Sequence, residues 1–98
     1  MKDCTRIEIV IEKALARTMA DLLVELNSPG YTMIDHAMGR GDRGERRGDD
    51  PTGASTNCVF IVACESQELV DTIVEGVRPL LTQSGGMCLL SEARWVKP

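Results

Sequence analysis

The segment from Thr5 to Glu12 reads T-R-I-E-I-V-I-E, and its alternation decides the fold. Ile7, Ile9 and Ile11 take every second position, and charged residues fill most of the positions around them. Successive side chains of a strand point to opposite faces, so this pattern predicts a half-buried β-strand. One face of the resulting sheet is therefore expected to meet a core.

An amphipathic helix is expected directly after this strand. Leucine and methionine recur from Leu15 to Leu26 at i, i+4, i+7, i+8 and i+11, which places them on one helix face. The spacing predicts a helix over residues 13–27, ended by the Pro-Gly pair that follows. Residues 31–38 predict a second, weaker strand, because β-favouring side chains gather in only part of it.

The second half of the chain repeats this order. Cys58 to Cys64 reads C-V-F-I-V-A-C, a nearly apolar run that is typical of a central strand covered on both faces. Ser66 suits a helix N-cap, and an apolar stripe predicts a helix over residues 67–82. Pro79 is expected to kink or end that helix. A Ser-Gly-Gly turn then leads to a last strand over residues 87–96.

The order β-α-β-β-α-β predicts an α+β, ferredoxin-like fold, also called split βαβ. Right-handed crossovers place both helices on one face of an antiparallel sheet. A chain of 98 residues fits a single domain, 1–98.

Charge and hydropathy exclude several classes of protein. The net charge of −4 argues against a nucleic-acid binder, which needs a positive field. The longest apolar run, residues 58–64, is far shorter than the roughly 20 residues of a membrane helix, so no membrane insertion is expected. No secretory signal is visible at the start, and a cytoplasmic protein is expected. Four widely spaced cysteines predict buried, reduced thiols and no metal site.

Residues 39–57 are the most unusual segment of the chain. They read G-R-G-D-R-G-E-R-R-G-D-D-P-T-G-A-S-T-N and hold half of the arginines. The segment is too long for a connector in so small a domain, which is typical of a functional loop. Arginine is suited to planar anions and phosphates. A solvated loop whose charges pair with one another is the alternative.

Other chemistries of this topology lack their residues here. The expected central strands carry no aromatic platform for RNA bases, apart from one phenylalanine. The turn after the first strand, residues 12–14, has neither a cysteine pair nor a phosphate cradle. No Ser-His-Asp set or convergent carboxylate pair is present. Anion or nucleotide binding without turnover remains, through the arginine loop and the backbone amides of Gly85 and Gly86.

At this point the chain resembles the PII signalling superfamily over essentially its whole length. The resemblance rests on the element order, on G-R-G at residues 39–41, on L-V-D-T at residues 69–72 and on the glycine turn before the last strand. It implies that residues 39–57 are the long mobile T-loop of that superfamily.

Departures from the superfamily pattern point to one branch of it. The glycine turn lacks the lysine of classical members, the loop lacks their modified tyrosine, and the C-terminal basic run is reduced to Arg94 and Lys97. The pattern is closer to PII-like proteins of inorganic-carbon metabolism, above all the carboxysome-associated kind. That kind implies binding of an adenine nucleotide (ADP, AMP or ATP) together with bicarbonate.

The resemblance also implies a homotrimer with nucleotides in the clefts between subunits. The nucleotide-binding residues that it implies lie in both halves of the chain: Thr32, Gly39, Arg40, Gly41, Arg43, Arg46, Ala63, Cys64, Glu65, Gly85, Gly86 and Met87. Bicarbonate would lie at the loop base, and the residues implied for it are Gly41, Arg46 and Arg47. The protein target would be a carboxysome component or a bicarbonate transporter.

Several of these residues also have a purely structural interpretation. Thr32 suits any strand, Cys64 suits a core, and Gly85 with Gly86 suits any turn. Arg47 can pair with the acids that follow it, and Arg94 can be a solvated edge residue.

Alternative functions remain open at the sequence level. No enzyme activity is expected, but a small PII-like nucleotide phosphohydrolase is the main rival. Regulation of a bicarbonate transporter, regulation of nitrogen metabolism, and a scaffold that binds no small molecule are further alternatives.

Overall fold

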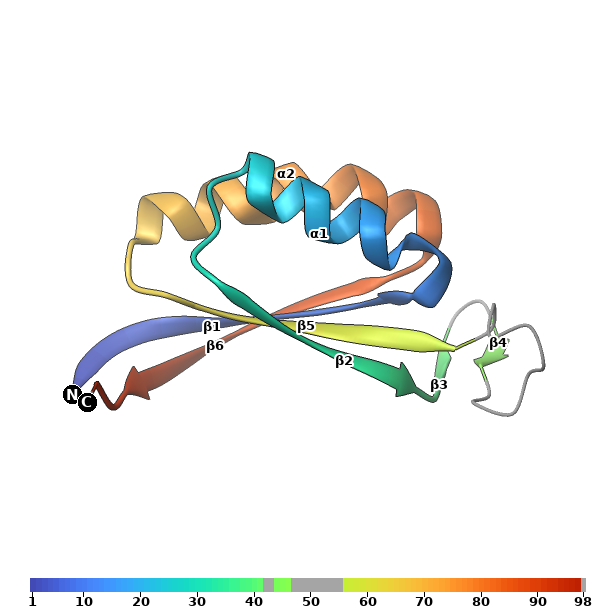
Figure 1. Ribbon diagram of the computed structural model, residues 1–98, viewed down its shortest axis with the longest axis horizontal. Helices are drawn as coiled ribbons and strands as arrows, with labels where there is room; N and C mark the ends of the chain where they lie inside the picture. The colour runs from blue at the N-terminus through green and yellow to red at the C-terminus, as the bar shows by residue number, and fades with distance from the viewer. Residues whose placement is uncertain (42–43, 47–55, 98) are drawn as a thin grey trace.

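The computed structural model describes residues 1–41, 44–46 and 56–97. Two helices lie on one face of a four-stranded antiparallel sheet with strand order β2-β5-β1-β6 (Figure 1). The elements in chain order are β1 (Lys2–Glu12), the 3₁₀-helix η1 (Lys13–Leu15), α1 (Ala16–Glu25), β2 (Tyr31–Ala37), β3 (Gly39–Gly41), β4 (Gly44–Arg46), β5 (Asn57–Cys64), α2 (Gln67–Ser84) and β6 (Met87–Trp95). The predicted fold class is therefore confirmed.

The core lies between the sheet and the two helices. Ile7, Ile9 and Ile11 of β1 face the helices and are at most 1% exposed, as the alternation predicted. The register pairs them with buried residues of β5, and directly paired residues share a sheet face. The helices complete the core with Met19, Leu23, Val70, Ile73 and Val77.

The other face of the sheet carries no helix. Because both helices cover the same face, the prediction that the central strand is covered on both faces is wrong for the single chain. Every second residue of β5 is only half-buried. We call this surface the open sheet face, and the register assigns to it Val10, Ile34, Val59, Ile61, Met87 and Leu89.

Three helix ends differ from prediction. A 3₁₀ turn precedes α1, and α1 ends before the Pro-Gly pair, because Asn27 adopts a left-handed conformation (φ 59°). The Ser28 amide then donates to the Leu23 carbonyl at 3.0 Å. Pro79 does not end α2, which continues to Ser84.

The remaining differences from prediction concern the start of β1 and two short strands within the predicted loop. β1 begins at Lys2, which pairs with Trp95, so both chain ends lie together opposite the β3–β4 end of the sheet (Figure 1). β3 and β4 pair as a short two-stranded sheet inside the predicted loop. The predicted mobility of the loop concerns residues that mostly lie outside the described ones. None of the described helices is long and apolar enough to cross a bilayer.

Candidate functional site

The predicted nucleotide-binding residues fall into two groups at opposite ends of the sheet. Ala63, Cys64 and Glu65 lie at the end of β5, whereas Met87 opens β6 at the other end. Cys64 pairs with Thr5 of β1, and Met87 pairs with Val10, five residues further along the same strand. Five residues of a strand span about 17 Å. One chain alone therefore does not bring the two groups together.

Thr32 and the loop residues complete the two groups. Thr32 pairs with Ile61, two residues before Ala63, so it lies nearer the first group. Gly39 and Gly41 belong to β3, which follows the end of β2 on the side of Met87. The predicted roles of Arg40, Arg43, Arg46 and Arg47 concern side chains outside the described part of the structure.

The Gly85–Gly86 turn has a clear structural role. Gly85 has φ 76°, a conformation that favours glycine, and it caps the C-terminus of α2. The amides of Gly85 and Gly86 donate to the Leu81 carbonyl at 2.9 and 3.1 Å. Both amides therefore already have an acceptor within the chain, and their predicted contact with an anion stays a prediction.

The β5 end is joined to the C-terminal segment by an ion pair. Lys97 Nζ lies 2.9 Å from Glu65 Oε1 and 4.9 Å from the centroid of the Trp95 ring. The hydrogen bond from Lys97 holds the pKa of the Glu65 carboxyl below its usual value. Cys64 is buried and donates to the Ser66 carbonyl through Sγ at 3.5 Å, so its side chain belongs to the core.

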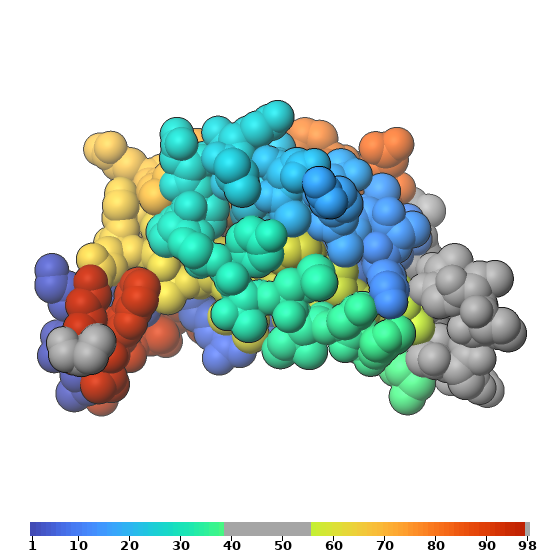
Figure 2. Space-filling view, in the orientation of Figure 1, coloured from blue at the N-terminus to red at the C-terminus, as the bar shows by residue number. Residues whose placement is uncertain are grey.

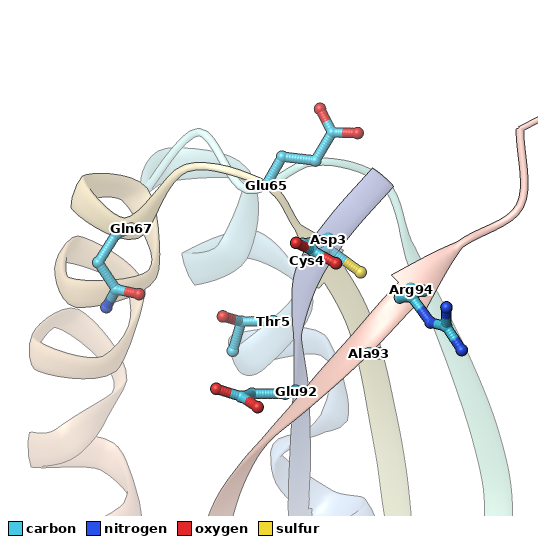
Figure 3. Close-up of a pocket in the computed structure, with 8 residues that line it drawn as sticks. All are labelled: Asp3, Cys4, Thr5, Glu65, Gln67, Glu92, Ala93 and Arg94. Atoms are coloured by element: carbon cyan, nitrogen blue, oxygen red, sulfur yellow. The ribbon is translucent and has the colours of Figure 1, made fainter. Parts of the chain in front are cut away.

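A polar hollow lies beside this ion pair, where β1 and β6 extend past the start of α2 (Figures 2 and 3). Its volume is about 550 Å³. Thr5 and Glu92 pair across β1 and β6, and with Gln67 they point into the hollow, whereas Arg94 points away from it. Sequence analysis missed this group, because Thr5 and Glu92 come together only through strand register. The lining residues are Asp3, Cys4, Thr5, Glu65, Gln67, Glu92, Ala93 and Arg94.

A smaller hollow of about 230 Å³ lies on the other side of the same strand ends. Arg6, Ala63 and Trp95 are among the residues that line it. Ala63, one of the predicted nucleotide-binding residues, therefore lines the same hollow as Arg6 and Trp95.

A polar cluster stands at the base of the 39–57 loop, where β2 ends. Lys13 Nζ lies 3.1 Å from Asp35 Oδ2 and 3.5 Å from His36 Nε2. The His36 amide donates to Asp35 Oδ1 at 2.8 Å. The hydrogen bond from Lys13, followed by that from the His36 amide, lowers the pKa of Asp35. No sequence motif predicted this cluster.

The cysteines are free thiols, as predicted, although only Cys58 and Cys64 are fully buried and Cys4 and Cys88 are half-buried. Burial raises the pKa of the Cys58 and Cys88 thiols. Within the described residues, no three His, Cys, Asp or Glu side chains gather in a way that would hold a metal ion.

A family model described as nitrogen regulatory protein P-II matches residues 4–97. The chain belongs to the P-II family. The resemblance inferred from the sequence is therefore confirmed, whereas the assignment of residues 39–57 as the T-loop stays a prediction. No curated protein matches the chain in sequence.

Solved structures agree with this assignment. CPII of Thiomonas intermedia, a nitrogen regulatory PII-like protein solved with ADP, AMP and bicarbonate, has a TM-score of 0.82 and 25% identity, covering 98% of this chain and 91% of that one. A PII-like signaling protein of Thermus thermophilus has a TM-score of 0.79 at 18% identity, covering 97% and 91% of the two chains. The GlnK–ATP complex of Bacillus subtilis has a TM-score of 0.62 at 15% identity, covering 95% and 84%. The last two share the fold.

Proposed function

We propose that this P-II chain is a signalling protein of inorganic-carbon metabolism that binds an adenine nucleotide and bicarbonate. The observation that carries the proposal is the similarity to CPII, whose structure holds ADP, AMP and bicarbonate, at 25% identity over 98% of this chain. The proposed ligand is ADP, AMP or ATP, bicarbonate is the proposed effector, and no metal is required. The setting would be the cytoplasm, with association to the carboxysome.

The nucleotide site lies between subunits of a homotrimer in this proposal. Two features of the single chain support it. The two groups of predicted binding residues lie about 17 Å apart along β1, so a second copy is needed to complete one site. The open sheet face carries apolar residues together with Arg6 and Glu8 and is uncovered in the single chain, and burial of such apolar residues drives association.

Bicarbonate lies at the loop base in this proposal, held by the Gly41 backbone, Arg46 and Arg47. Guanidinium groups bind planar oxyanions through two parallel hydrogen bonds, which suits bicarbonate as well as phosphate. Arg40 and Arg43 would contact the nucleotide phosphates. Ligand binding would then set the conformation of the 39–57 loop, which would meet a carboxysome component or a bicarbonate transporter.

Calorimetric titration of ADP, with and without bicarbonate, tests the function. We expect ADP to bind and bicarbonate to tighten it, because linked sites change one another's affinity by the same factor. ADP binding that is indifferent to bicarbonate would remove the carbon link and leave a nucleotide sensor, with nitrogen regulation as the next candidate. No heat in either buffer would overturn the proposal.

The arginine assignment is tested with Arg46→Ala. Loss of a charge-assisted contact to phosphate or bicarbonate should weaken ADP binding in the presence of bicarbonate. Arg78→Ala is the matched control, because Arg78 is exposed on α2 and pairs with Glu75 at 3.0 Å. Equal affinities for the two variants would remove Arg46 from the site.

Turnover is the main rival to a purely regulatory role. We expect ATP to bind without hydrolysis, since sequence analysis found no catalytic set. Phosphate release from ATP above that of a protein-free blank would instead favour a PII-like phosphohydrolase. Measuring this release in the wild type and in Arg46→Ala separates true turnover from a contaminant.

A further inference from the structure

A groove of about 440 Å³ lies between α1 and α2. Both helices cover the sheet face opposite the open one, so the groove stays accessible when open sheet faces associate (Figure 1). The α1 wall consists of Thr18, Asp21, Leu22 and Glu25. Residues at i, i+3, i+4 and i+7 share one face of a helix, so this wall is two turns, or about 10 Å, long.

The α2 wall follows the same spacing, with Gly76, Pro79, Leu80 and Gln83. A β-carbon built on Gly76 would lie 2.6 Å from both terminal carbons of Leu26, so glycine lets α1 approach α2 closely at this end. Leu22 and Leu80 are partly buried against the core and supply an apolar base. Two helical walls over an apolar base form a shape that a further helix can fill.

The walls of the groove offer hydrogen-bond acceptors, and none of its lining residues is cationic. Asp21 Oδ1 lies 3.5 Å from Arg17 Nε at the solvent-exposed surface. No described lysine or arginine pairs with Glu25. Pro79 has no amide hydrogen, so it cannot donate to the Glu75 carbonyl as a regular helical residue would. These acceptors suit ammonium and guanidinium donors of a partner.

The charge of the whole helical layer has the same sign as the groove. α1 and α2 carry five carboxylates and two guanidinium groups, a net charge of −3. The whole chain has a net charge of −4, so most of it lies on the helices. A negative surface attracts positively charged partners and raises their association rate. Shape and charge therefore favour the same kind of partner.

We propose that the α1–α2 groove docks a helical segment of a partner protein, with small apolar side chains on one face and lysine or arginine on its flanks. The apolar face covers Leu22 and Leu80, and the flanking cations meet Asp21 and Glu25. The contact is only about two helical turns long, so the interaction is weak and salt-sensitive. It is separate from the proposed nucleotide site and does not depend on it.

A synthetic peptide with a fluorescent label is the probe. It has about 18 residues, enough to form a helix in water, with alanine and leucine along one face and lysine elsewhere. We expect it to bind the wild type at low salt, measured by fluorescence anisotropy, and to lose most of this binding at about 0.5 M salt. A peptide of the same composition in scrambled order should bind about fivefold more weakly or worse, because its apolar residues no longer share a face.

Charge reversal locates the bound peptide. Glu25→Lys should raise the peptide Kd by a factor of about three to ten, since it replaces attraction by repulsion at an exposed site. Glu68→Lys is the matched control, because it makes the same change in net charge in the first turn of α2 and does not line the groove. It should raise the Kd by less than about twofold. Circular dichroism checks that both variants are folded.

Filling the groove tests its shape without a change of charge. Thr18→Trp places an indole ring on the α1 wall and should weaken peptide binding. Thr72→Trp makes the same substitution at an exposed position of α2 outside the groove, and should leave the Kd unchanged. Equal affinities of the two tryptophan variants would contradict docking in the groove.

Other results would also overturn the proposal. These are absence of peptide binding to the wild type, equal effects of Glu25→Lys and Glu68→Lys, and equal affinities for the ordered and scrambled peptides. A lower sedimentation coefficient of Glu25→Lys without peptide would assign the groove to a second copy of the chain instead. A wild type that binds the peptide but no ADP would refute the proposed function and leave the groove as a docking site.

Discussion

Gly86 stands where the turn after α2 approaches β1. A β-carbon built on Gly86 would lie 2.7 Å from the Val10 carbonyl oxygen and 2.9 Å from Leu81 Cδ2. Because the Val10 contact is with backbone, the clash cannot be relieved by rotation of a side chain. We expect Gly86→Ala to lower the free energy of unfolding by about 1–3 kcal/mol, the usual range for overpacking. Urea denaturation measures the change.

Gly30 supplies the control for this prediction. Nothing lies within 4 Å of a β-carbon built there, and its φ is not in the left-handed region. Gly30→Ala should therefore be neutral or stabilise the protein slightly, through the unfolded state. If Gly86→Ala proved as stable as Gly30→Ala, the close approach to Val10 would be refuted.

Glu65 is the residue through which pH should act on the C-terminal segment. Its pKa is lowered in the folded chain by Lys97, so the ion pair contributes stability above the unfolded pKa of about 4.3. That contribution is lost as the pH falls through the lowered value. Lys97→Met should therefore reduce the urea midpoint at pH 7, and the difference from wild type should shrink below about pH 4.

A difference that grew on acidification would contradict the sign of the Glu65 shift. Arg17→Met serves as the comparison, because it breaks an exposed pair away from the C-terminal segment. Both partners of the Glu65–Lys97 pair are partly solvated, so the effect should be modest and should fall in high salt.

At the scale of elements, α2 depends on its first turn. Ser66 has an extended conformation, and its Oγ accepts a hydrogen bond from the Leu69 amide at 3.2 Å. Ser66→Ala should cost about 1 kcal/mol of stability, because the Leu69 amide loses its partner. Ser66→Asp should retain the cap and add a favourable charge at the helix N-terminus. Thermal denaturation of the two variants should give Tm values in that order.

Equal Tm values for Ser66→Ala and Ser66→Asp would show that the cap contributes nothing measurable.

The cap was predictable from sequence, since serine before an acidic first turn is a local signal. The alternation in β1 was predictable for the same reason, because one strand contains the whole pattern.

Elements that depend on distant contacts were not predictable in the same way. Lys2 extends β1 because Trp95 pairs with it, and no local pattern indicates this. α2 runs through Pro79, although proline removes one helical hydrogen bond, because apolar residues on both sides of it pack against the core. β3 and β4 contain mainly glycine and charged residues, which carry no strand signal.

At the scale of the whole molecule, the open sheet face should control assembly. Ile61→Glu would place a second carboxylate beside Glu8, which pairs with Ile61 in the register of β1 and β5, and burying it between copies would be costly. We expect this variant to sediment as a monomer where the wild type sediments as a trimer. Val24→Glu is the control, since Val24 is an apolar residue of α1 that is 69% exposed and lies on the helical side.

A trimer that survived Ile61→Glu would place the subunit contact elsewhere. The same variant should lose ADP binding if the site needs two subunits, whereas Val24→Glu should keep it. Assembly and ligand affinity measured on one pair of variants therefore test the shared site directly.

The candidate site was only partly predictable for the same physical reason as the fold. Composition indicated an anion-binding loop, and the family resemblance assigned residues to it. The contact between Lys13 and His36 joins residues 23 positions apart and exists only after η1 and β2 have been brought together. The polar hollow near Glu92 likewise requires the register of β1 with β6.

The position of β1 in the sheet has a consequence for how the chain folds. Both of its neighbours, β5 and β6, come from the second half of the sequence. During synthesis, Ile7, Ile9 and Ile11 therefore emerge long before any strand can pair with them. Closing such long segments is slow, and unpaired apolar strands attract chaperones or other chains. β1 precedes the other strands of this sheet in the chain and is thus among the last to be fully paired, so this sheet should be complete only after β6 has emerged.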